Sequence, residues 1–259
     1  PFLSRKKAEF GVGIARMEDR YFQTNIIDFS ETKHDKSTYS IFGGSIVLEG
    51  STLNARQFAT QGSREKMAAQ IFTGTEHFRS GASKVTKDTP EPYKKVQSWL
   101  QVSYQNETYH KVSPKFTLGA YLEAYYSSRN FSNNYTATLM QAGEFTPTAH
   151  SKVTYNEAFR ANQYAGVGAM PIYQLSESFQ LRGEFYGFVP IFPIKKDEYG
   201  QAYYGKAFTK FEYLGEISLV FQLSFGSISA YVNHYSSPSN DWNVGLTLGW
   251  QLFNSRFIE

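Results

Sequence analysis

Four glutamates carry the residue type that general acid and base catalysis uses, and two of them lie close together in the sequence. They are Glu123, Glu184, Glu212 and Glu216. A suitably spaced pair of carboxylates can donate and accept a proton during bond cleavage. Here, however, Arg182 and Lys210 are interleaved with them on predicted strands, which is typical of the polar filling of a β-barrel. We therefore predict no catalytic residue in this chain.

Metal binding is the other chemistry that the residue types allow, because the chain has five histidines: His34, His77, His110, His150 and His234. They lie far apart, mostly in predicted loops or turns, and none shows the spacing of metal ligands. The absence of cysteine excludes a disulfide scaffold and thiolate chemistry. The sequence thus predicts neither a metal site nor a cofactor.

The strand predicted over Asp241–Phe253 indicates the kind of sheet that would hold these residues. One phase is apolar and the other is polar or small: Trp242, Val244, Leu246, Leu248, Trp250 and Leu252 alternate with Asn243, Gly245, Thr247, Gly249 and Gln251. In a soluble sandwich the apolar face would point at a core. A stripe this long, with Trp242 and Trp250 near its ends, instead favours a barrel wall in lipid.

Composition agrees with that interpretation. The 259 residues include 22 Phe, 19 Tyr and 3 Trp, yet the mean hydropathy is −0.44. A helical membrane protein would show runs of roughly 18 or more apolar residues, and the sequence has none. A barrel hides its hydrophobicity in alternate residues. The net charge of +3 gives no argument for nucleic acid as a partner. Because the sequence starts at Pro1 without a methionine or a signal peptide, we expect a longer precursor.

The alternation recurs along the whole chain, which we interpret as one all-β domain over residues 1–259 with no confident helix. It predicts about eleven strands, near residues 7–17, 21–29, 40–50, 64–76, 96–105, 116–124, 162–173, 179–189, 211–223, 225–235 and 241–253. An odd number does not close a bacterial barrel of the usual even-stranded kind. Either one strand is missed or further strands lie upstream.

Connection lengths predict the orientation of this barrel. Long connections at residues 77–95, 127–159 and 190–206 alternate with short turns, of which Ser51–Ser63 is the longest. Transmembrane barrels have short periplasmic turns and long external loops, so we expect a periplasmic C-terminus and an external loop at 127–159. That loop and its flanks carry Tyr125, Tyr126, Phe131, Tyr135 and Phe145. Their aromatic character favours a packed loop over one that contacts lipopolysaccharide or a partner.

Several segments resemble known outer-membrane proteins. Gly245, Leu248, Trp250 and Phe253 resemble the closing-strand signal of bacterial outer-membrane barrels, which implies the barrel assembly machinery as a partner. The segments at 51–63, 159–166, 179–184 and 252–259 together resemble the C-terminal barrel of patatin-like phospholipase family proteins of Bacteroidetes outer membranes. That barrel is similar to the superfamily of outer-membrane assembly factors and two-partner secretion transporters.

The resemblance implies a transmembrane antiparallel β-barrel of about 16 strands, of which this chain would hold the C-terminal part. It also implies an upstream lipid hydrolase with a Ser–Asp dyad. Neither the Gly-x-Ser-x-Gly elbow nor the Asp motif of that enzyme occurs in this sequence. Whether the parent protein is an enzyme therefore stays open.

One pair of residues is implied by the superfamily alone. There an Arg of the long external loop folds inward and pairs with an acidic residue of the wall. Arg160 occupies the matching place and Glu184 is the nearest acid on the following strand, although the surrounding motifs differ from the usual ones. Such an ion pair would hold the loop in one register. The alternative is that Arg160 is a solvated charge at the rim.

The function expected from these observations is an outer-membrane barrel that anchors a patatin-like lipid hydrolase. Two alternatives stay open: an assembly-factor-like barrel that inserts or translocates polypeptides, and a non-enzymatic accessory barrel of a larger complex. Expected partners are outer-membrane lipids and lipopolysaccharide, together with a homo-oligomer or a larger outer-membrane complex.

Overall fold

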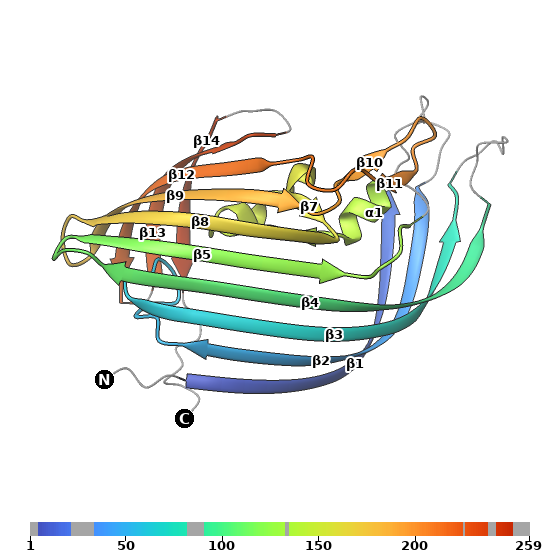
Figure 1. Ribbon diagram of the computed structural model, residues 1–259, viewed down its shortest axis with the longest axis horizontal. Helices are drawn as coiled ribbons and strands as arrows, with labels where there is room; N and C mark the ends of the chain where they lie inside the picture. The colour runs from blue at the N-terminus through green and yellow to red at the C-terminus, as the bar shows by residue number, and fades with distance from the viewer. Residues whose placement is uncertain are drawn as a thin grey trace.

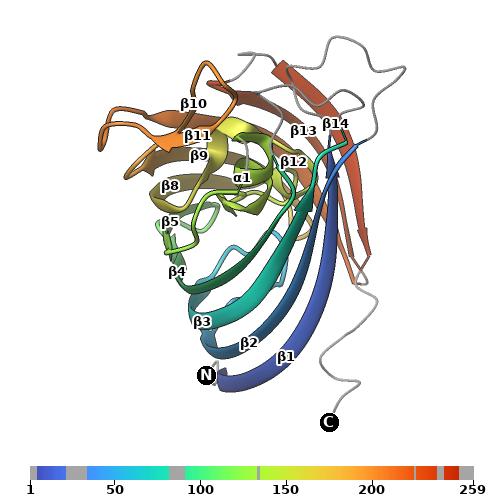
Figure 2. The same ribbon diagram turned by 90° about the vertical axis from the view of Figure 1, so that its right-hand side faces the viewer.

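The computed structural model describes residues 5–21, 34–81, 91–132, 135–224, 226–237 and 242–250. Ten long strands form one antiparallel sheet in the order β1-β2-β3-β4-β5-β8-β9-β12-β13-β14. Their bounds are β1 Arg5–Tyr21, β2 Asp35–Ser51, β3 Gly62–Arg79, β4 Tyr93–Lys111, β5 Phe116–Ser127, β8 Gln163–Gln174, β9 Phe179–Pro190, β12 Glu212–Leu223, β13 Gly226–Tyr235 and β14 Trp242–Trp250. The sheet curves strongly around a concave space (Figures 1 and 2).

Shorter elements lie in the connections. The β5–β8 connection holds α1 (Tyr135–Gln141), the strand pair β6 (Gly143–Glu144) and β7 (Arg160–Ala161), and two 3₁₀ turns at Ser151–Val153 and Glu157–Phe159. The β9–β12 connection forms a small hairpin from β10 (Ile194–Lys196) and β11 (Ala202–Tyr204). Figure 2 shows α1 on the concave side of the sheet. Within the described ranges, no helix is long and apolar enough to cross a membrane.

The all-β prediction is confirmed, whereas the predicted number of strands is wrong. Ten of the predicted strands correspond to the ten strands of the sheet, and the one expected near Tyr21–Phe29 lies outside the described residues except for Tyr21, which ends β1. The four additional strands have only two or three residues each. Segments that short contain no measurable alternation, so periodicity could not detect them.

The two faces of the sheet have inverted polarity. On the outer, convex face the apolar side chains are exposed, for example Ile14 at 86%, Val244 at 80% and Leu246 at 81%. The inner face buries polar groups that soluble proteins leave in water, among them Glu76, Gln180, Glu184, Glu216 and Asn233. In the described strands for which the sequence predicts a phase, the apolar phase thus lies outward.

The sheet ends at β1 on one side and at β14 on the other. In the part of the chain that the structure describes, β1 pairs only with β2 and β14 only with β13. Each edge strand therefore has one row of backbone N–H and C=O groups that are not paired with another strand of this sheet.

Candidate functional site

Two connections enter the concave interior of the sheet from opposite ends of the strands. The first, here called the inserted turn, comprises residues 52–61 between β2 and β3. Asn54 closes it, because its side-chain oxygen accepts hydrogen bonds from the backbone N–H groups of Thr60 (2.9 Å) and Gln61 (3.1 Å). Gly62 ends it at φ +89°, where a Cβ would lie 2.2 Å from the carbonyl oxygen of Thr52. Only glycine fits there.

Phe58, at the tip of the inserted turn, has a left-handed backbone with φ +53°. That conformation is unfavourable for a bulky residue and persists only where surrounding contacts impose it. Its carbonyl oxygen accepts hydrogen bonds from Gln180 Nε2 (3.3 Å) and Gln222 Nε2 (3.1 Å) on two neighbouring strands. Its ring lies 5.9 Å from the Arg182 guanidinium. The inner face of the sheet thus fixes the tip of the turn.

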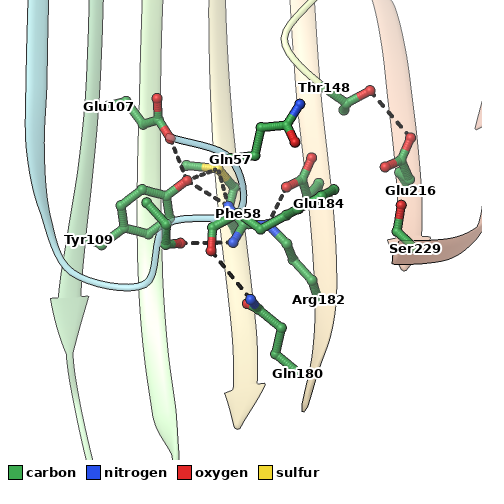
Figure 3. Close-up of polar contacts among 12 residues, drawn as sticks. Gln57, Phe58, Glu107, Tyr109, Thr148, Gln180, Arg182, Glu184, Glu216 and Ser229 are labelled. Carbon is green, nitrogen blue, oxygen red and sulfur yellow. Dashed lines mark hydrogen bonds and ion pairs between the residues drawn. The ribbon is translucent and has the colours of Figure 1, made fainter. Parts of the chain in front are cut away.

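A buried arginine on β9 ties the inserted turn to the sheet (Figure 3). Arg182 Nη1 donates to the carbonyl oxygen of Ala59 (2.8 Å) and Nη2 donates to the Tyr109 hydroxyl on β4 (2.6 Å). Its Nε forms an ion pair with Glu184 on the same strand. Both charged side chains are almost fully buried, so the loss of either partner would leave an uncompensated charge inside the protein.

The second connection, here called the inserted loop, comprises residues 128–162 between β5 and β8. Phe145 and Phe159 are 2% exposed and pack among inward-facing Tyr164, Tyr186 and Phe188. Ring centroids in this cluster lie 5.1 to 6.3 Å apart, the separation of favourable aromatic pairs. The inserted loop therefore packs into the concave interior along much of its length, which agrees with the packed loop that its aromatic residues predict.

His150 connects the inserted loop to the inner face of β12 and β13. Its Nδ1 lies 2.6 Å from Glu216 Oε1, and its Nε2 lies 3.1 Å from Ser229 Oγ. The imidazole stacks on the Tyr231 ring at 3.7 Å. The Thr148 hydroxyl donates to the second Glu216 oxygen at 3.3 Å, a contact that Figure 3 shows beside Ser229.

The Ser229, His150 and Glu216 side chains share the connectivity of an acyl-transfer triad, in which an acid orients a base that activates a hydroxyl. All three are almost completely buried, and Ser229 is 1% exposed. A substrate carbonyl cannot reach a hydroxyl that is enclosed in this way. The arrangement instead satisfies buried polar groups and fixes the loop.

The predicted pair of Arg160 and Glu184 does not form. Arg160 Nη2 lies 2.7 Å from Glu144 Oε2, and its Nη1 donates to the carbonyl oxygens of Leu139 and Met140. The cause is the β6–β7 pair, whose register places Glu144 directly opposite Arg160. Glu184 is held by Arg182 instead. A two-residue strand leaves no periodic signal in the sequence, so the pairing of Arg160 with Glu144 could not be predicted from it.

Arg160 also lies over an aromatic ring of the inserted loop. Its guanidinium carbon is 4.6 Å from the centroid of the Tyr155 ring. All of these partners of Arg160 lie within the inserted loop. Arg160 therefore holds parts of the loop together and does not join the loop to the sheet.

The remaining predicted residues lie apart from this cluster. Of the closing-strand set, Gly245 and Leu248 lie in β14 and Trp250 ends it, while Phe253 lies outside the described residues. Glu123 accepts a hydrogen bond from the Tyr164 hydroxyl (2.6 Å), and Glu212 pairs with Lys210 at 3.3 Å. Each carboxylate has separate partners, and no group of three or more potential metal ligands occurs among the described residues.

A cavity of about 150 Å³ remains between the two inserted segments. Phe58 and Arg56 border it from the inserted turn, Thr148 and Lys152 border it from the inserted loop, and Arg182 borders it from the sheet. This volume accommodates water or a small polar molecule. It does not accommodate a polypeptide.

The sequence does not single out His150 and Ser229, and it predicts Arg182 only as polar filling of the barrel. Arg182 could have been found from the sequence, since it lies on the predicted polar phase of a strand. No sequence signal distinguishes His150 from the other histidines. Comparison with known proteins identifies no relative: no family model, no curated protein and no solved structure matches the chain.

Proposed function

We propose that this chain is the wall of a transmembrane β-barrel in the bacterial outer membrane, with an interior filled by the inserted turn and the inserted loop. The observation that carries the proposal is the inverted polarity of the sheet. Apolar side chains are exposed along the outer face of nearly every long strand, whereas charged and amide side chains are buried inside.

An outer face of this kind would be costly in water. Each exposed side chain of valine, leucine, isoleucine or phenylalanine size forgoes about 1.5–3 kcal/mol of burial free energy, and contiguous apolar patches of such extent are rare on soluble monomers. Hydrocarbon removes this cost. The alternation of apolar outward and polar inward residues is also the pattern of membrane barrels.

Closure of the barrel is part of the proposal. In hydrocarbon, the free edges of β1 and β14 need hydrogen-bonding partners, because every unsatisfied backbone group costs several kcal/mol there. Further strands of the same protein would supply them. This agrees with the resemblance to a barrel with more strands than the ten described.

Within the membrane, we propose an anchoring role for the barrel, with a patatin-like lipid hydrolase upstream. Two observations support anchoring over transport of polypeptides through the interior. The inserted segments are fixed by buried hydrogen bonds to several strands, and the space left between them is small. The hydrolase itself rests on the sequence resemblance.

Residues 1–259 contain no cysteine, so a single thiol can be placed in a full-length protein whose upstream cysteines are replaced by serine. Its reactivity tests the membrane position directly. Leu246→Cys places a thiol on the outer face of β14, and Tyr199→Cys places one on the exposed β10–β11 hairpin. With the full-length protein in intact outer membranes, a water-soluble maleimide should label the Tyr199 variant at least about tenfold faster, because a thiol in hydrocarbon meets neither water nor the reagent.

Denaturation in detergent should make the two thiols react equally, which controls for intrinsic reactivity. Fast labelling of Leu246→Cys in intact membranes would show that the outer face meets water. That result would overturn the proposed membrane position.

A further inference from the structure

The outer face of the sheet is hollowed where β8, β9, β12, β13 and the start of β14 run side by side. The groove has a volume of about 670 Å³, within the range of small-molecule binding sites. Its side chains are almost entirely apolar and include Val167, Phe185, Ile217 and Trp242. This groove is separate from the inserted segments, which lie on the opposite face.

A missing side chain creates the groove. Gly215 on β12 lies in an outward row whose neighbouring residues are large, such as Tyr213 and Ile217. At Gly187 on β9, by contrast, the Phe211 ring covers the position, 3.0 Å from where a Cβ would lie. Gly215 lies opposite Phe185 in the register. A Cβ added at Gly215 would find its nearest neighbour, the Phe185 ring, at 3.7 Å. The position thus has ordinary space for a side chain and lacks one.

Aromatic rings mark one end of the groove, where β12 begins and β13 ends. The Tyr213 and His234 rings stack at 5.8 Å, and the His234 and Trp242 rings lie 4.8 Å apart. Lys210 precedes Phe211 at the same end and pairs with Glu212. Amphipathic rings and cations at strand ends are typical of the membrane–water interface. The groove therefore runs from the expected interface toward the apolar middle of the strands.

We infer that this groove binds one acyl chain of a membrane lipid, with the polar head beside His234 and Trp242. The inference rests on the proposed membrane position. A chain inside the groove contacts a floor and two walls, so it gains more close van der Waals contacts than a chain on the flat face. The aromatic rings at one end of the groove determine which way round the lipid lies. The apolar walls alone do not.

Native mass spectrometry of the full-length protein in mild detergent tests this site. Gly215→Phe fills the groove, and Gly44→Phe is the matched control. Gly44 faces outward on β2, where an added Cβ would meet its nearest atom at 3.8 Å. We expect one copurified lipid on the parent protein and on Gly44→Phe, and about a tenfold lower occupancy on Gly215→Phe. Such a difference corresponds to about 1.4 kcal/mol of binding free energy.

Adding dioleoyl-phosphatidylglycerol to the delipidated proteins gives an independent readout. The lipid should return to the parent and to Gly44→Phe but not to Gly215→Phe. Gly215→Val replaces the phenylalanine variant if the latter does not fold.

Equal lipid occupancy on all three proteins, or no lipid on the parent before and after addition, would overturn the inference. So would a dimer without lipid that Gly215→Phe converts to monomer, because a second copy would then occupy the groove. Maleimide labelling of Leu246→Cys separates the two proposals. If Leu246→Cys is shielded in membranes but the protein holds no lipid, the lipid-binding groove is contradicted and the membrane position stands.

Discussion

At the scale of single residues, His150 joins the inserted loop to the sheet more closely than the predicted Arg160 does. Its two ring nitrogens contact Glu216 on β12 and Ser229 on β13, and its ring covers Tyr231. Because Glu216 is buried, its carboxylate depends on these hydrogen bonds. The wall and the loop therefore share one polar network.

Replacement of this residue should loosen the loop. His150→Ala leaves Glu216 buried without its closest partner, at a cost of about 1–3 kcal/mol. We expect chymotrypsin to cleave the folded protein after the exposed Tyr155 about tenfold faster in this variant, since about 1.4 kcal/mol of loop opening corresponds to that factor.

His110→Ala is the matched control, because His110 is exposed at the end of β4, away from the inserted loop. It should leave the cleavage rate unchanged. If His150→Ala is also cleaved at the parent rate, this histidine does not hold the loop.

At the scale of elements, β12 shows how one strand serves two environments. Tyr213, Ile217, Leu219 and Phe221 are exposed on the outer face, while Glu212, Glu216 and Ser218 are buried on the inner face. A shift of one residue in its pairing would exchange the two sets. The polarity of each strand therefore fixes its register against its neighbours.

A charged side chain in the outward-facing row of β12 should destabilise the folded protein. Leu219 lies in that row, opposite Leu181 on β9 and Ala230 on β13. If the outer face lies in hydrocarbon, Leu219→Arg should destabilise the protein by about 2–4 kcal/mol near the middle of the bilayer. Urea titration of the protein folded into lipid vesicles measures this change.

Leu219→Met serves as the control and should cost less than about 1.5 kcal/mol, because it conserves volume and polarity. An arginine variant that is as stable in vesicles as the methionine variant would assign this row to water.

At the scale of the whole molecule, two features must be explained together: an interior that its own segments fill in part and a sheet with two free edges. The inserted turn and the inserted loop approach each other at Phe58 and His150, whose ring centroids are 6.3 Å apart. Contacts from the two segments reach strands from β1 to β13, including Asp19, Tyr39 and Ser227. The interior is thus built as a unit, which suits an anchor.

The free edges lead to a prediction about the native polypeptide. We expect its intact mass to exceed 29.5 kDa and its upstream sequence to contain additional alternating strands, preceded by a Gly-x-Ser-x-Gly elbow and its Asp. Mass spectrometry with peptide sequencing of the protein from its source measures both. Upstream strands without the hydrolase motifs would favour an accessory barrel, and tandem periplasmic modules in their place would favour a translocase.

Period-two alternation in the amino-acid sequence predicts the ten long strands and, for most of them, the face on which each side chain lies. The reason is local, because a strand alternates its side chains with a period of two wherever it pairs. Ten strands and the polarity of Leu246, Glu184 and Glu216 followed from that rule alone. The tertiary structure alone decided which residues meet inside. His150 and Ser229 are separated by 79 positions, and Arg182 meets a carbonyl 123 positions away. Such contacts depend on the path of two irregular segments through the curved sheet, and irregular backbone has no period from which that path could be predicted.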